Sequence, residues 1–218
     1  MEDKKRNPRI IHLWWILGLL LISVVINIPL PFDKVRRGDI MSSEYLVYPF
    51  IRESVMEHGQ FPHWIPTYLG GMPFFANSLN PVLYLWNWLF LLIPISVEAL
   101  VALRIILIPF IGASLMYLLM INLKVRAPYA FISGLFFMLP ADLRTWSYAW
   151  QQRLDAVSLL PLVFLFLYKA VETKEWLKYG ILTGVVVALQ FHTSGFIPLL
   201  FTFFLFFCYY LFRLASKK

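Results

Sequence analysis

Long apolar runs separated by short polar segments dominate the chain of 218 residues. The first run, 11–31, follows a basic flank and has the roughly 20 residues that a membrane-spanning helix needs. We predict five further spans, at 98–123, 127–140, 154–171, 177–191 and 196–213. The run 81–94, at about 14 residues, is too short to span comfortably, so we expect it to dip into the outer leaflet or lie along it. The pattern predicts an all-α integral membrane protein with about six transmembrane helices in a single membrane domain, 1–218.

Composition and charge agree with this class. The chain is 60% apolar and 14% charged, whereas soluble domains are roughly 25% charged. The net charge of +7 raises the question of nucleic acid, but 12 of the 19 basic residues and 4 of the 12 acidic ones lie in four segments. These segments are 1–10, 124–126, 169–178 and 213–218. Cytoplasmic loops carry such an excess of Lys and Arg. We expect a multi-pass protein of the cell membrane, with both termini cytoplasmic and no nucleic-acid partner.

The largest segment between predicted spans is 32–97, which this topology places on the extracytoplasmic side. Tyr48 precedes Pro49, which suits a helix that begins at the proline, and Gly59 is placed to end it. One side of this helix is apolar, so we expect it to lie on the membrane surface. The following stretch, 59–73, is rich in glycine, proline and aromatic residues and suits a folded lip at the interface.

Chemistry is expected where ionisable groups meet the outer membrane boundary. Asp39 follows Gly38 a few residues beyond the first predicted span. A carboxylate there can act as a general base towards a hydroxyl, or bind a divalent cation such as Mg²⁺ or Mn²⁺ together with Glu44. The alternative is an ordinary turn aspartate or helix cap, which is common after glycine.

A second group of candidates lies in 141–153, which joins two short predicted spans on the same side. It includes Arg144, Trp150, Gln151 and Arg153. Arginine between aromatic residues at a membrane surface suits a phosphate headgroup or a sugar. The alternative is an interfacial aromatic belt with snorkelling arginines.

Arg104 falls about two turns into the span predicted at 98–123. Charged side chains inside a membrane usually face the protein interior. Glu98 does not share a helix face with Arg104, so it is not the expected partner. Either a partner comes from another segment, or the arginine snorkels to the interface.

The order of several motifs in the first half of the chain carries a resemblance to a known family. These motifs are Gly38-Asp39, Tyr48-Pro49-Phe50, Pro62-His63-Trp64-Ile65-Pro66 and Gly70-Gly71-Met72-Pro73. Their order resembles the membrane module of GT-C type glycosyltransferases, and most closely the bacterial YfhO-like membrane proteins of the cell envelope. The resemblance covers nearly the whole chain, and the first loop carries most of it.

The resemblance implies a GT-C-like fold and an enzyme that takes a sugar from a polyprenyl-phosphate carrier. The acceptor is then a glycan or a protein on the outer side, and the transfer is an inverting direct displacement. Asp39 matches the acidic residue of the first loop that serves as base or metal-linked carboxylate, and Glu44 is a second, looser match. We expect substrate contacts from His63, Trp64, Arg144, Trp150, Gln151 and Arg153.

A non-catalytic role is the alternative to a transferase. Relatives of this kind usually continue for several hundred more residues, with further spans and often a soluble domain. The chain is then a membrane scaffold or a partner subunit that retains a truncated GT-C fold and is completed by a second membrane chain.

Overall fold

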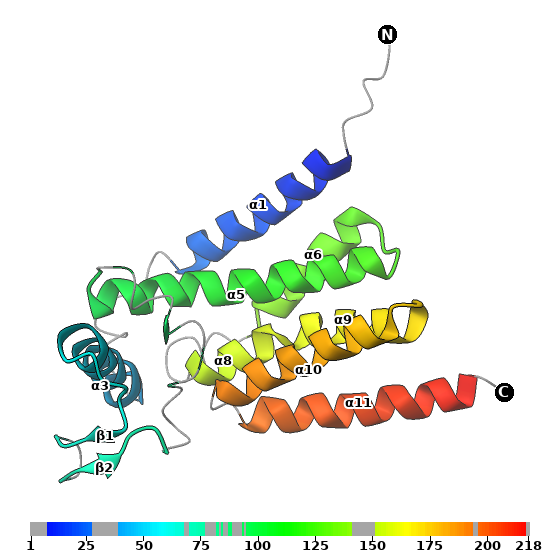
Figure 1. Ribbon diagram of the computed structural model, residues 1–218. Coiled ribbons are helices and arrows are strands. Elements are labelled where there is room, and N and C mark those ends of the chain that lie inside the picture. The colour runs from blue at the N-terminus through cyan, green and yellow to red at the C-terminus, as the bar shows by residue number, and fades with distance from the viewer. Residues whose placement is uncertain are drawn as a thin grey trace.

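The computed structural model describes residues 8–27, 39–67, 70–76, 82, 84, 87–88, 93, 95–140, 151–193 and 196–216. Helices of different lengths lie side by side and form the body of the molecule (Figure 1). They are α1 (Pro8–Asn27), α5 (Val97–Asn122), α6 (Ala127–Met138), α8 (Gln151–Ser158), α9 (Leu160–Glu172), α10 (Trp176–His192) and α11 (Phe196–Ser216). The fold is therefore mostly helical, as the apolar runs predict.

Within the described ranges, four helical segments are long and apolar enough to cross a membrane. They are Ile10–Asn27, Val97–Asn122, Arg153–Glu172 and Ile197–Ala215, and the third of them combines α8 and α9. The structure thus supports a membrane protein. Two of the predicted spans correspond to shorter helices, α6 with 12 residues and α10 with 17. The count of six crossings stays a prediction.

Helix α5 is the centre of the bundle, because it contacts α1, α6, α8 and α9. Its start follows from the sequence: Ser96 is the N-cap, whose side chain accepts a hydrogen bond from the Ala99 amide at 3.2 Å. Glu98 in the first turn has the charge that favours a helix N-terminus. These residues fix the point at which the chain enters the bundle.

Two glycines allow the helices to approach closely. A Cβ atom at Gly134 of α6 would lie 2.8 Å from the carbonyl oxygen of Ala113 in α5. A Cβ atom at Gly112 of α5 would lie 3.2 Å from Cα of Ser158 in α8. Small residues at such contacts are typical of membrane helices, whose association depends on van der Waals packing. Glycine at both positions therefore sets the distance from α5 to α6 and from α5 to α8.

The elements of the first predicted loop lie at one end of the bundle, and both chain termini lie toward the other end (Figure 1). Helix α3 (Asp39–Arg52) continues directly into the π-helix η1 (Glu53–Glu57). Strands β1 (Trp64–Ile65) and β2 (Met72–Pro73) pair antiparallel, with Trp64 opposite Pro73. The residues Val47, Ile51, Ile65, Phe74 and Val82 form a small apolar core that joins α3 to the hairpin.

The expectation that a helix begins at Pro49 is wrong. Helix α3 begins at Asp39 and passes through Pro49. A proline inside a helix removes one backbone hydrogen bond, and here the chain changes to π geometry at Glu53, one turn later. The predicted end is confirmed, because η1 stops at Glu57 and Gly59 has a φ of 61°, which favours glycine.

Most of the run 81–94 lies outside the described residues. Among its described members, Val82, Tyr84 and Asn87 are buried, Trp88 is half-buried and Ile93 is exposed. The depth of this segment in a membrane stays a prediction.

Replacing Gly134 by alanine tests the close approach of α5 and α6. The added Cβ collides with backbone, and overpacking of this kind costs about 1–3 kcal/mol. We expect Gly134→Ala to lower the unfolding temperature in detergent by about 2–4 °C for each kcal/mol lost. Gly184→Ala in α10 is the matched control, because nothing lies within 4 Å of its added Cβ. Unfolding is measured by circular dichroism. Equal unfolding temperatures for Gly134→Ala and Gly184→Ala would contradict this packing.

Candidate functional site

The predicted catalytic residues Asp39 and Glu44 both belong to α3, the helix at the loop end of the bundle. Asp39 is the first residue of this helix. The structure does not describe the side chains of Asp39 and Glu44, so the roles predicted for them remain predictions. Arg144 and Trp150 fall in 141–150, which also lies outside the described residues.

His63 and Trp64 lie together on an exposed aromatic surface next to the hairpin. The His63 ring packs on Phe61 at 4.9 Å and on Phe75 at 6.1 Å between ring centroids. Trp64 is 56% exposed, and its indole covers Gly71. Aromatic faces of this kind can stack on a sugar ring or lie in the membrane interface. The structure brings these two predicted residues together.

Gln151 and Arg153 begin α8 inside the bundle rather than at the hairpin. Gln151 is buried, and its Nε2 lies 3.5 Å from the carbonyl oxygen of Val101 in α5. Arg153 is half-buried. The interior position of Gln151 favours a role in holding α8 against α5 over the direct substrate contact that we expected.

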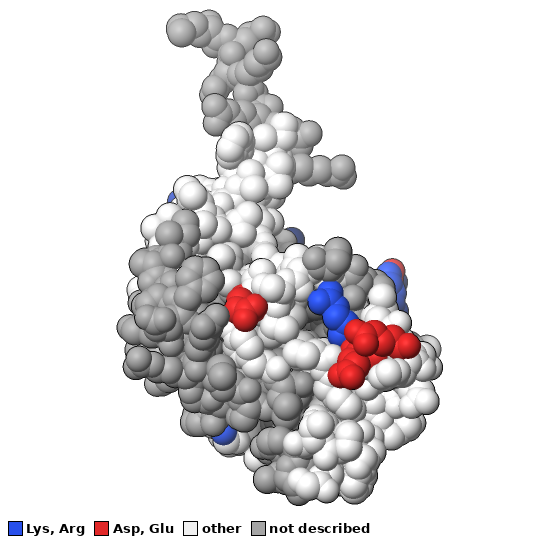
Figure 2. All heavy atoms as spheres, turned by 90° about the vertical axis from the view of Figure 1, so that its left-hand side faces the viewer, with Lys and Arg blue, Asp and Glu red and all other residues white. Residues whose placement is uncertain are grey.

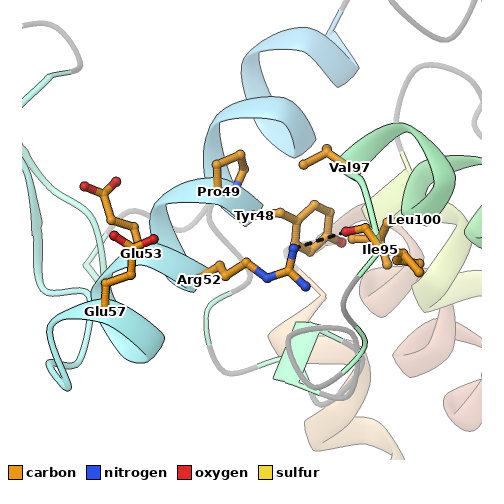
Figure 3. Close-up of a pocket in the computed structure, with 8 residues that line it drawn as sticks. All are labelled: Tyr48, Pro49, Arg52, Glu53, Glu57, Ile95, Val97 and Leu100. Atoms are coloured by element: carbon orange, nitrogen blue, oxygen red, sulfur yellow. Dashed lines mark hydrogen bonds between the residues drawn. The ribbon is translucent and has the colours of Figure 1, made fainter.

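A cavity of about 280 Å³ lies at the loop end of the molecule, between α3 and the start of α5 (Figure 3). The residues that line it are Tyr48, Pro49, Arg52, Glu53, Glu57, Ile95, Val97 and Leu100. The same end carries a group of acidic side chains next to a basic one, and a second acidic patch stands apart from them (Figure 2). None of the predicted site residues with described side chains lines this cavity. The sequence prediction therefore missed it.

Arg52 is the positively charged residue in the lining of the cavity. Its guanidinium donates to the carbonyl oxygens of Ile95 at 3.1 Å and Ile93 at 2.6 Å. These two bonds fasten the end of α3 to the segment before α5, and Figure 3 shows the one to Ile95. A guanidinium has five N–H donors in a planar fork that matches phosphate oxygens. Arg52 can therefore hold the wall of the cavity and still offer a donor to an anion.

Glu53 and Glu57 form the acidic side of the cavity, with their carboxylates toward each other and away from the Arg52 guanidinium (Figure 3). His58 lies next to them, with Nε2 3.8 Å from Oε1 of Glu53. The ligand atoms of these three exposed residues lie within 4.8 Å of one another. Carboxylates and an imidazole at this spacing can hold a divalent cation, or remain a solvated surface group. The set differs from the predicted pair of Asp39 and Glu44.

A buried ion pair lies behind the cavity. Arg104 of α5 donates through an Nη atom to a carboxylate oxygen of Asp155 in α8, and neither side chain is exposed. The expectation that a partner for Arg104 comes from another segment is confirmed, and snorkelling is excluded. The sequence held a signal for this pair, because both charges lie in apolar runs where an ion needs a partner.

Two tyrosines connect this ion pair to the loop end. The guanidinium carbon of Arg104 lies 5.6 Å from the ring centroid of Tyr48, and the Tyr48 hydroxyl donates to Oδ1 of Asn87 at 2.9 Å. Burial raises the pKa of the Tyr84 hydroxyl well above its usual value of 10.0, and the negative charge of Asp155 raises it further. The segment that carries Tyr84 and Asn87 therefore contacts α3 and lies within electrostatic reach of Asp155 in α8.

Comparisons with protein-family models, curated proteins and solved structures give no match to this chain. The resemblance to GT-C type glycosyltransferases therefore rests on the sequence motifs.

The raised pKa of Tyr84 predicts a pH dependence of stability. Above about pH 10 the unfolded chain releases the tyrosine proton that the folded protein keeps, so the folded state loses stability as pH rises. Between about pH 9 and pH 11, the unfolding temperature of Tyr84→Phe should therefore fall less than that of wild type. The control for loss of a hydroxyl is Tyr129→Phe, at an exposed tyrosine. Identical pH profiles for wild type and Tyr84→Phe would contradict the prediction.

Proposed function

We propose that the protein is a membrane glycosyltransferase that uses a polyprenyl-phosphate sugar and acts at the end of the bundle that carries α3. The observation that supports this proposal most directly is the cavity between α3 and α5, which joins a cation, carboxylates and apolar side chains. A lipid-linked sugar phosphate presents a matching set of an anion, hydroxyl groups and a hydrocarbon chain.

Each part of the cavity has a proposed partner in the donor. Arg52 binds the phosphate, because a guanidinium forms bidentate, charge-assisted hydrogen bonds with it. Ile95, Val97 and Leu100 contact the first part of the lipid chain. The acidic side, Glu53 and Glu57, faces the sugar or a divalent cation such as Mg²⁺ or Mn²⁺. The donor therefore reaches the cavity from the membrane, and the acceptor reaches it from water.

The proposed reaction is a direct displacement at the anomeric carbon. The acceptor hydroxyl oxygen forms a bond to that carbon while the bond to the phosphate oxygen breaks, which inverts the centre. A carboxylate takes the hydroxyl proton as general base, which the sequence prediction assigns to Asp39 with Glu44 assisting. Asp39 and Arg52 are the first and last residues of α3, about 20 Å apart by helical rise, so Glu53, which lines the cavity beside Arg52, is the second candidate for this base. The leaving phosphate keeps the bonding electrons, and Arg52, Arg144 and Arg153 stabilise its charge. His63 and Trp64 hold the acceptor, a glycan or a protein, on the aromatic surface.

We further propose that the α3 end faces outside and that the six apolar segments of the sequence prediction all cross the membrane. The turn from α5 to α6 carries Lys124 and Arg126, and the turn from α9 to α10 carries Lys174. Both turns lie at the end of the bundle toward which the termini lie (Figure 1). Positive charge of this kind favours the cytoplasmic side, which makes both termini cytoplasmic.

The function is tested by transfer from a polyprenyl-phosphate sugar to an acceptor glycan by purified protein. Loss of a general base costs about 10²–10⁴-fold in rate, so we expect Asp39→Asn to lose most activity. Lys174→Ala, at an exposed position in the turn between α9 and α10, is the control and should keep wild-type activity. Full activity in Asp39→Asn would refute its role. Absence of transfer by wild type, alone or with a partner chain, would favour the scaffold or partner-subunit role.

The orientation is tested by cysteine labelling in a Cys208→Ser background. Thr67 and Thr173 are exposed. Thr67 follows β1 and Thr173 caps the C-terminus of α9, and these two elements reach opposite ends of the molecule (Figure 1). We expect an impermeant thiol reagent added to intact cells to label Thr67→Cys and to spare Thr173→Cys. Labelling of Thr173→Cys with protection of Thr67→Cys would reverse the proposed orientation.

A further inference from the structure

Tyr48 belongs to two environments at once. Its side chain lines the cavity, and its ring lies over the guanidinium of Arg104. The residue is 3% exposed, so its position is set by the groups packed around it. A cation over an aromatic ring attracts that ring electrostatically, and the attraction is stronger where water is excluded. The position of Tyr48 therefore depends on where Arg104 places its charge.

Arg104 is held in place by Asp155. Both side chains are fully buried, and the bond between them joins α5 to α8. Removing one member of a buried pair leaves an uncompensated charge, whereas replacing both by apolar residues is often tolerated. Asp155 thus determines the position of the guanidinium that lies against Tyr48.

The hydroxyl of Tyr48 has a separate attachment. It donates to Asn87, which is 1% exposed. The ring and the hydroxyl are thus fixed from two directions, by the bundle and by the segment before α5. Tyr48 is therefore one of the contacts by which the bundle holds α3.

We infer that Arg104 and Asp155 are positioning residues for the cavity, which fix Tyr48 and thereby the wall that α3 contributes. The consequence for donor binding rests on the proposed function. The consequence for the position of α3 does not. Neither residue contacts the donor in this scheme, because both lie behind Tyr48.

Gln190 provides a matched control for the loss of a buried polar contact. It is fully buried in α10, and its Nε2 donates to the carbonyl oxygen of Ala156 in α8 at 2.7 Å. Its side-chain oxygen accepts from Thr202 of α11. Gln190→Leu therefore removes one polar contact between α10 and α8 and one between α10 and α11. General weakening of the bundle affects Gln190 and Asp155 variants alike, whereas positioning of α3 affects the Asp155 variant alone.

The test is the distance distribution between spin labels at Met56→Cys and Lys174→Cys in a Cys208→Ser background, measured in lipid nanodiscs. Both label sites are exposed, one beside the cavity and one at the opposite end. We expect Asp155→Asn to broaden the distribution and Gln190→Leu to leave it as in wild type. An unchanged distribution in Asp155→Asn, or equal broadening in Gln190→Leu, would overturn the inference.

A second variant keeps the test decisive if Asp155→Asn does not fold. The double variant Arg104→Met/Asp155→Leu removes both charges and should fold. Because Tyr48 then lacks its cation, we expect the broadened distribution to persist. A wild-type distribution in the double variant would overturn the inference.

Binding of a polyprenyl monophosphate, followed by tryptophan fluorescence, provides the functional readout. We expect the double variant to bind about 5–30-fold more weakly than wild type, the equivalent of one cation–π contact. Equal affinity would overturn the consequence for donor binding. If wild type itself does not bind this probe, the proposed function fails, and the distance distribution alone decides whether the pair positions α3.

Discussion

A pair of opposite charges in an apolar bundle is the constraint on which the rest of the structure depends. Arg104 and Asp155 are fully buried, and desolvation of each ion is repaid only while the two stay together. Breaking such a pair costs about 3–5 kcal/mol, a large part of the stability of a typical domain. The folded chain must therefore hold α5 and α8 together in one register.

Close packing surrounds α5 on several sides. Gly112 meets α8 and Gly134 meets the backbone of α5 from α6, so both neighbours approach without a side chain between them. On the other side, Ser23 of α1 donates to the carbonyl oxygen of Ile106 at 2.7 Å. Polar and small residues add to the apolar contacts of the bundle, because lipid offers no hydrophobic drive between helices.

The sequence predicts the long helices well and the site poorly, and the reason is the range of the interactions. Span length and hydropathy are local, so the runs at 11–31 and 98–123 correspond to α1 and α5. The start of α3 was missed, because the local preference for proline in the first turn does not account for tertiary packing. The partner of Arg104 lies 51 positions away, and no pattern of one helix can name it.

The candidate site residues also divide into those that the local sequence brings together and those that only folding brings together. His63 and Trp64 share an aromatic surface because they are adjacent in sequence, and the motif that contains them already indicates a lip. The cavity joins Arg52 to Leu100 across the segment before α5, so it exists only after folding. The sequence did not mark Arg52 as a site residue, because an arginine near a helix C-terminus is common.

The length of α5 relates this cavity to the thickness of the host bilayer. Its 26 residues extend for about 39 Å, whereas a hydrocarbon core measures about 30 Å. The excess of about 9 Å has to be taken up by tilt or by an overhang into the headgroups. Val97 and Leu100 stand on the first turn of α5, so any overhang at that end lifts the cavity towards water, and a thicker membrane draws it back among the lipid carbonyls.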